Sequence, residues 1–185
     1  MMLTIIIFML FCFYITWSMV TKKRHSVKMS HYKHRVHVNG IRGKSSVTRL
    51  VSASLREGGI QTLAKTTGTA ARLIIDHETD VVIKRKEADI AEQKREIDKS
   101  VINADEALVF ECMAINPIYQ AYLENNIMYS DIGIITNVRE DHMDLLGKTL
   151  PEIARSLCAT IPKNGHLVTA EYNPELVRIL RAECD

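Results

Sequence analysis

The segment Val36–Ser46 constrains the fold of this chain more than any other feature. It places a glycine-rich turn and a Lys-Ser pair between an extended apolar run and a helical pattern. In such a turn, backbone N–H groups surround a phosphate, the positive end of the next helix faces it, and the lysine reaches the β- and γ-phosphates. The sequence therefore predicts a strand, a phosphate-binding loop and a helix, with ATP or GTP as the ligand. The residues that we assign to the nucleotide are Gly40, Ile41, Arg42, Gly43, Lys44, Ser45 and Ser46.

The match to the phosphate-loop pattern is incomplete, because Val38 stands where the pattern has its first glycine. The shorter Gly-x-x-Gly-Lys-Ser form also fits an ordinary strand-to-helix turn. The flanking residues favour the phosphate loop, since Arg35–Asn39 alternates as a strand does and Lys44–Glu57 carries apolar residues at helical spacing before a glycine pair. In this interpretation the Ser45 hydroxyl is a ligand of Mg²⁺.

Strand-like and helix-like segments alternate along the rest of the chain. The expected strands lie at 61–66, 107–112, 132–137 and 166–170, and the expected helices at 87–105, 117–125, 150–161 and 174–182. This alternation predicts an α/β fold, with a parallel sheet, helices on both faces, and the ligand site at the carboxyl ends of the strands. With 185 residues and 46% hydrophobic residues, the chain can hold one such domain, expected over 35–185.

The N-terminus begins with an apolar run, Leu3–Val20, of eighteen uncharged residues. As a helix this run would span about 27 Å, which is just enough to cross a bilayer. Basic residues follow at 22–24 and no small-residue cleavage site appears, so the pattern predicts an uncleaved anchor over residues 1–20. Because positive residues stay in the cytoplasm, we expect a single-pass protein of the cell membrane with a cytoplasmic catalytic domain. A buried core helix is the alternative, which the lack of a polar face disfavours.

Charge is distributed unevenly along the chain. Residues 1–56 contain ten Lys and Arg and no Asp or Glu, whereas residues 57–185 contain fourteen basic and twenty-two acidic side chains. We interpret the basic stretch 21–34 as a solvated juxtamembrane linker that anionic headgroups favour. Its histidines have no neighbouring Cys or carboxylate to complete a metal site. The four cysteines form no Cys-x-x-Cys pair, which fits reduced thiols.

Three of the expected strand ends carry reactive side chains. Glu111 ends an apolar strand, at the position of the acidic residue that holds Mg²⁺ in phosphate-loop proteins. Asn137 begins a polar cluster that includes the pair Asp141-His142. Thr67 belongs to a run of hydroxyls and a glycine after the second strand. Each also fits a simpler alternative, a surface glutamate or an ordinary turn, and the residues alone leave both interpretations open.

Together, these pieces resemble the ATPase domain of Mur ligases and folylpolyglutamate synthetases, and closer still the ATP-dependent ligase subunits of poly-γ-glutamate capsule synthases. The motifs that carry the resemblance are Gly40–Ser45, Lys65–Thr69, Glu111–Pro117 and Asn137–Gly147. The resemblance implies the phosphate-loop fold of the Mur ligase central domain, incomplete here, behind one transmembrane helix. It also implies a reaction in which a substrate carboxylate is activated as an acyl phosphate and an amine then forms a γ-glutamyl amide bond.

The resemblance further implies roles for individual residues. The residue matching Lys44 binds the β- and γ-phosphates in that superfamily, and the one matching Ser45 takes the first Mg²⁺. Residues matching Glu111 and His142 hold a second Mg²⁺, with Thr67 as a further ligand. The implied catalytic residues are thus Lys44, Glu111 and His142, the metal ligands are Ser45, Thr67, Glu111 and His142, and Asn137 joins the nucleotide-binding set.

Two departures from the family pattern stand out. Many Mur-type ligases have a carbamylated lysine that would fall near Leu157, where this chain has no lysine. The chain also stops in its last predicted helix, so we expect the front half of a ligase. The implied partners are glutamate and the growing polymer, the membrane, integral-membrane synthase subunits and a second copy of the chain, without nucleic acid. A membrane-tethered phosphate-loop kinase and a non-catalytic nucleotide-binding assembly subunit are the alternatives.

Overall fold

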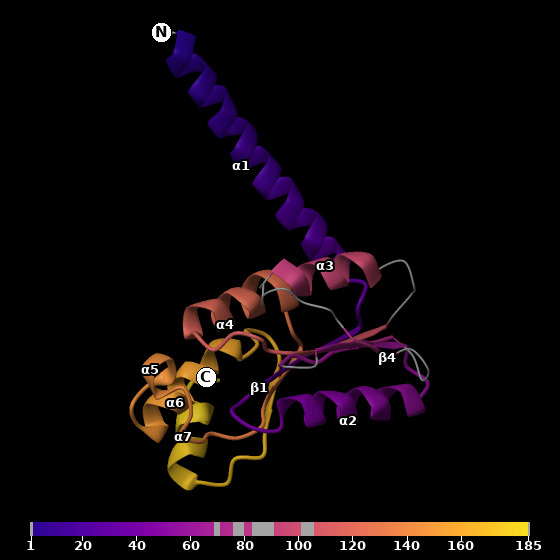
Figure 1. The fold of residues 1–185 in the computed structure, drawn as a ribbon, viewed down its shortest axis with the longest axis vertical. Coiled ribbons are helices and arrows are strands. Elements are labelled where there is room, and N and C mark those ends of the chain that lie inside the picture. Colours follow the sequence, from indigo (N-terminus) through magenta and orange to yellow (C-terminus); the bar gives the residue numbers. More distant parts are fainter. Residues whose placement is uncertain (1, 69–70, 76–79, 83–90, 101–105, 185) are drawn as a thin grey trace.

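A largely parallel sheet carries the fold (Figure 1). The computed structural model describes residues 2–68, 71–75, 80–82, 91–100 and 106–184. At the centre, β1 (His34–Asn39) pairs in parallel with β5 (Ala107–Glu111) and β6 (Ile132–Ile135), while β2 (Thr62–Lys65) and β7 (His166–Thr169) extend the sheet in parallel beyond them. These five strands confirm the five predicted from the sequence. Their carboxyl ends meet at one edge of the sheet, so the residues that follow them are neighbours.

The edge of the sheet beyond β2 is antiparallel. There, β3 (Arg72–Ile74) pairs with β2, and β4 (Asp80–Val82) pairs with β3, which gives the strand order β4-β3-β2-β5-β1-β6-β7. The prediction of a parallel sheet is therefore correct for five strands and wrong at this edge. Strands of three residues are too short to show an alternating pattern, and for this reason the sequence did not reveal them.

Helices cover both faces of the sheet, as the alternation predicted (Figure 1). On one face, α2 (Lys44–Glu57) packs over a core cluster that includes Val109. On the other face, α3 (Ala91–Ser100) and α4 (Pro117–Leu123) pack over a second cluster that includes Phe110. Because successive residues of a strand point to opposite faces, neighbouring side chains of β5 belong to different cores. The rest of the helix predicted over 87–105 lies outside the described residues.

The carboxyl-terminal half supplies shorter elements around β6 and β7. They are the π-helical turn η2 (Glu124–Met128), α5 (Met143–Leu146), α6 (Leu150–Leu157), the 3-10 turn η3 (Cys158–Thr160) and α7 (Pro174–Ala182). α6 and α7 pack together in a third core cluster. Side chains that cap a helix before a proline in its first turn are Asn116, Thr149 and Asn173. Such caps satisfy backbone N–H groups that have no partner within the helix and fix where it begins.

The N-terminal helix α1 (Met2–Met29) is longer than the predicted anchor. None of its most apolar 18-residue window is buried inside the structure, so this helix is not part of the core described here, and by length and composition it can cross a membrane. The carboxyl-terminal end of α1 and the residues just after it, here called the foot of α1, pack on the domain. His25, Met29 and Tyr32 are buried there. The Nε2 atom of His25 lies 2.9 Å from the carbonyl oxygen of Ile127. The prediction of a solvated linker over 21–34 is therefore wrong at this foot, because these side chains complete the core under α3.

Candidate nucleotide site

The loop between β1 and α2 requires glycine at two positions. Gly40 has a φ of +119°, and a β-carbon there would lie 2.2 Å from Oγ1 of Thr136. Gly43 has a φ of +83° in the position that caps α2. Both conformations lie in the region where an L side chain is strained. The two glycines therefore let the chain leave β1, pass close against β6 and enter α2 with its backbone N–H groups at the loop.

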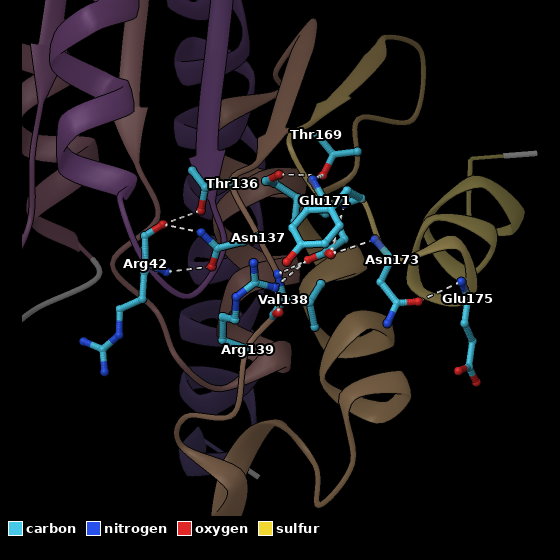
Figure 2. Close-up of polar contacts among 11 residues, drawn as sticks. Arg42, Thr136, Asn137, Val138, Arg139, Thr169, Glu171, Asn173 and Glu175 are labelled. Atoms are coloured by element: carbon cyan, nitrogen blue, oxygen red, sulfur yellow. Dashed lines mark hydrogen bonds and ion pairs between the residues drawn. The ribbon is translucent and has the colours of Figure 1, made fainter.

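The residues at the end of β6 hold this loop in place (Figure 2). The backbone N–H of Arg42 donates to Oδ1 of Asn137 at 3.1 Å, and Nδ2 of Asn137 donates back to the Arg42 carbonyl at 2.9 Å. Oγ1 of Thr136 donates to the same carbonyl at 2.8 Å. The N–H of Ile41 donates to the Asn137 carbonyl at 3.2 Å. Asn137 thus braces the phosphate loop, a role that sequence reasoning missed.

The loop lysine and serine both bond within the protein. The Lys44 ammonium donates to the carbonyl oxygens of Gly40 at 2.8 Å and Ile41 at 3.4 Å. Oγ of Ser45 donates to Oε2 of Glu111 at 2.8 Å. Lys44 and Ser45 form the first turn of α2, so their side chains begin where the positive end of the helix dipole lies. Ser46 is exposed one residue further along.

Glu111, a predicted metal ligand, is hydrogen-bonded to two other predicted ligands. Its carboxylate is almost fully buried at the end of β5. Oε2 accepts both the Ser45 hydroxyl and the backbone N–H of Thr67, each at 2.8 Å. The structure therefore brings Ser45, Thr67 and Glu111 together, and Thr67 makes its contact through the backbone.

His142 follows the end of β6, at the start of α5. It has a φ of +44° at the start of α5, and its backbone N–H donates to Oδ1 of Asp141 at 2.9 Å. The other Asp141 oxygen pairs with the Arg42 guanidinium at 2.9 Å. A pocket of about 200 Å³ has Gly40, Arg42, Lys44, Asp141 and His142 among its lining residues. His142 and Lys44 therefore face the same pocket.

The carboxylate, hydroxyl and imidazole groups do not form a closed metal cage. Within the described residues, no three His, Cys, Asp or Glu side chains are grouped so that they could hold a metal ion. A protein that binds Mg²⁺ through phosphates needs only one or two carboxylates, since water and phosphate oxygens complete the octahedron. The buried Glu111 carboxylate beside the Ser45 hydroxyl fits that pattern.

A second carboxylate organises the neighbouring strand end (Figure 2). The Glu171 side chain is 1% exposed, and its Oε2 accepts the backbone N–H of Val138 at 2.9 Å and Nη1 of Arg139 at 3.1 Å. Its Oε1 accepts the N–H groups of Tyr172 at 3.0 Å and Asn173 at 3.1 Å. Burial alone would raise the pKa of Glu171, but these backbone donors hold the pKa below its ordinary value.

Sequence reasoning also missed Glu171. A polar residue directly after the last predicted strand was the available signal, by the same logic that singled out Glu111. Beside it lies a pocket of about 460 Å³, whose lining includes Arg139 and Tyr172. The Arg139 guanidinium lies 5.8 Å above the Tyr172 ring. The residues that follow β6 thus contact the phosphate loop through Asn137 and line a second pocket from Val138 onward. That pocket is lined by a charged side chain, Arg139, and an aromatic one, Tyr172.

Comparison with known proteins identifies the family. Residues 38–183 match the model of the Mur ligase middle domain. The chain belongs to this family. A capsule biosynthesis protein CapB of Bacillus anthracis is 42% identical over 162 residues, which cover 86% of this chain and 35% of that protein. A PGA synthase CapB of Bacillus subtilis is 48% identical over 153 residues, covering 81% and 39%. This chain therefore spans well under half the length of these two relatives.

Solved structures agree on the fold. A folylpolyglutamate synthase complexed with AMPPCP matches with a TM-score of 0.55 and 17% identity over 87% of this chain and 47% of that one. The Escherichia coli protein FolC in complex with ADP matches with a TM-score of 0.57 and 15% identity, over 87% and 44%. At these identities the likeness concerns the fold alone. The fold class and the resemblance to Mur ligases are both confirmed.

Proposed function

We propose that this chain is the nucleotide-binding part of an ATP-dependent ligase that forms γ-glutamyl amide bonds in poly-γ-glutamate. The observation that carries the proposal is the convergence of Ser45 and Thr67 on Glu111, beside the loop that carries Lys44. Membership of the Mur ligase family supports the reaction type. The names of the two CapB relatives, one a capsule biosynthesis protein and one a PGA synthase, support the product.

The phosphates of ATP bind, in this proposal, at the start of α2. The Lys44 ammonium exchanges its bonds with the loop carbonyls for the β- and γ-phosphates, and the helix dipole stabilises the same charge. A magnesium ion would be held by Glu111 and Ser45, with Thr67 and His142 as the further predicted ligands. When bound, such an ion neutralises charge that develops during phosphoryl transfer. A carboxylate substrate would receive the γ-phosphoryl group and react as an acyl phosphate with an amine.

The nucleoside extends from the phosphate loop past Asn137. The pocket next to Glu171 begins one residue beyond, at Val138, and its Arg139 and Tyr172 walls suit a planar base. In this arrangement Glu171 positions Arg139 and Tyr172, because it accepts the backbone N–H groups of Val138 and Tyr172, which also line the pocket. The role of Asn137 is then to hold the loop and the base pocket at a fixed separation.

The proposed location is the cell membrane. α1 crosses the bilayer once, and the positive residues 22–24 keep the ligase domain in the cytoplasm. Glutamate and the growing polymer are the substrates, and integral-membrane synthase subunits and a second copy of the chain are the proposed protein partners. No contact with nucleic acid is proposed.

Glutamate-dependent release of ADP tests the function. We expect release that requires Mg²⁺ and glutamate, with D- and L-glutamate tried separately, when the chain is mixed with the remaining carboxyl-terminal part of the Bacillus subtilis relative. The matched variant is Lys44→Ala, which should abolish release. ADP release without glutamate would favour a regulatory ATPase, and transfer of phosphate to another acceptor would favour a kinase. Either result would overturn the ligase proposal.

A further inference from the structure

Helix α4 turns an uncharged apolar face to the outside of the molecule. Ile118 is 74% exposed, Tyr119 53% and Tyr122 51%. Another side of the helix is anchored, since Leu123 and Gln120 are buried. Large apolar side chains that are exposed side by side on one helix indicate a surface that binds a membrane or another molecule.

The segment that bears this face lacks exposed charge. Residues 117–128, which form α4 and η2, contain a single ionisable group that is charged at neutral pH, Glu124. That carboxylate is buried, with its Oε2 atom 2.8 Å from Nδ1 of His37. The exposed face therefore offers hydrocarbon, hydroxyls and the neighbouring Asn126 amide, and covering it does not require a charged group to lose its water.

The face of α4 points to the side of the domain from which α1 rises. Figure 1 shows α3 and α4 on one side of the sheet, with α1 leaving from that side and α2 on the opposite side. The foot of α1 shares a core cluster with α4, through Met29 and Leu123. Because Gln120 and Leu123 are the buried residues of α4, its exposed residues face outward from the helix layer that lies on the same side of the sheet as α1.

We propose that Ile118, Tyr119 and Tyr122 contact the headgroup region of the bilayer that α1 enters. This inference rests on the proposed membrane anchoring. Tyrosine is enriched at membrane interfaces, where its ring lies among the headgroups and its hydroxyl stays hydrated. An isoleucine beside two tyrosines adds apolar area at the same depth. The basic residues 22–24 on α1 attract the same anionic surface.

The contact would fix the orientation of the nucleotide site. Ile115, which is 38% exposed, precedes α4 and lines the pocket that also contains Lys44 and His142. A bilayer against α4 therefore lies beside this pocket. A single membrane helix leaves a domain free to rotate about its axis, whereas a second contact point removes that freedom. The site would then hold one orientation relative to any partner in the same membrane.

Fluorescence quenching by brominated lipid tests both membrane claims separately. The chain contains one tryptophan, Trp17, within the apolar part of α1. The full chain is reconstituted into vesicles of phosphatidylcholine and phosphatidylglycerol, with or without bromine on the acyl chains near the headgroup. In a Trp17→Phe background, Tyr122→Trp and Tyr119→Trp each report on α4. Leu50→Trp is the matched control, because Leu50 is 67% exposed on α2, across the sheet.

We expect bromine to reduce the fluorescence of Tyr122→Trp and Tyr119→Trp by a fraction comparable to that of Trp17 in the parent chain, and to leave Leu50→Trp unchanged. Quenching of Trp17 without quenching at either α4 position would overturn the α4 contact and leave the anchor standing. Equal quenching of Leu50→Trp would also overturn it, because the contact would not be specific to one face. An unquenched Trp17 would overturn the anchor and, with it, this inference.

Discussion

A buried pair joins His37, in the strand that leads into the phosphate loop, to Glu124 of η2, and Glu124→Gln measures its contribution to stability. Nδ1 of His37 is 2.8 Å from Oε2 of Glu124, and both side chains are almost fully buried. Oε1 of Glu124 accepts the backbone N–H and the hydroxyl of Ser130, at 2.9 Å and 2.8 Å. Because the glutamine oxygen can keep the bonds to Ser130, its amide nitrogen must turn toward His37.

The size of the effect follows from the loss of one buried charge. Burial by itself would lower the pKa of His37, but the neighbouring Cys112 and Glu124 side chains raise it to about 10. Removing one partner of a buried ion pair costs about 3–5 kcal/mol. For a domain of this size, such a loss lowers the melting temperature by roughly 6–20 °C.

The pair also gives the stability a definite dependence on pH. The pKa of His37 is raised in the folded state, so its contribution is complete below the ordinary value of 6.5 and disappears as the pH rises through about 10. Burial alone would raise the pKa of Glu124, but the His37 contact lowers it, so its contribution is lost only in acid. Stability of the wild type should therefore fall between pH 6.5 and 10, and Glu124→Gln should flatten this fall.

Thermal denaturation in detergent micelles, followed by circular dichroism across this pH range, is the assay. Glu106→Gln is the matched control, because Glu106 also lies 2.8 Å from a cation, Lys33, but on the surface. Exposed pairs of this kind contribute little, so the control should melt as the wild type does. If Glu124→Gln melted within a few degrees of the wild type and kept its pH slope, the buried pair would not stabilise the fold and the reasoning would be refuted.

Three further substitutions test the loop. Lys44→Ala should abolish binding of a fluorescent ATP analogue with Mg²⁺, since charge-assisted bonds contribute about 1.5–3 kcal/mol each. Asn137→Ala removes two bonds to the loop backbone and should weaken the same binding about 5- to 150-fold, whereas Asn126→Ala, remote from the loop, should not. Gly40→Ala should cost about 1–3 kcal/mol of stability in calorimetry, and more than Gly59→Ala, where a β-carbon meets nothing within 4 Å.

The strands and the phosphate loop could be predicted because their signals are local. Residues 107–110 are apolar throughout, and the glycines and Lys44 follow β1 within a few residues. Because the carboxyl ends of parallel strands meet at one edge of the sheet, the sequence predicted that Glu111 lies near the loop. The structure shows the contact itself, a hydrogen bond from the Ser45 hydroxyl to Glu111. Nothing in that reasoning required a long-range contact to be known in advance.

The missed features depend on contacts between distant segments. Asn137 braces Arg42 across 95 residues of chain, and Glu171 bonds Val138 across 33. Periodicity carries no information about such pairs, because the amide or carboxylate has no preferred spacing from its partner. The foot of α1 was misjudged for the same reason. His25 looks solvated in a basic stretch, and only the position of Ile127 shows that it is buried.

Thr67 was predicted as a metal ligand, and in the structure it contacts another predicted ligand, Glu111. Its backbone N–H, with the Ser45 hydroxyl, holds Oε2 of Glu111, whereas the predicted ligand is its hydroxyl. Thr67→Ala preserves the backbone bond, so the fold and the Glu111 rotamer should remain and the melting temperature should not change. If the hydroxyl binds the ion, the Mg²⁺ concentration needed for nucleotide binding should rise about tenfold, and Thr67→Ser should restore it. An unchanged Mg²⁺ requirement in Thr67→Ala would limit Thr67 to its backbone role, and Glu111 would then depend on Ser45, His142, phosphate and water to complete the coordination.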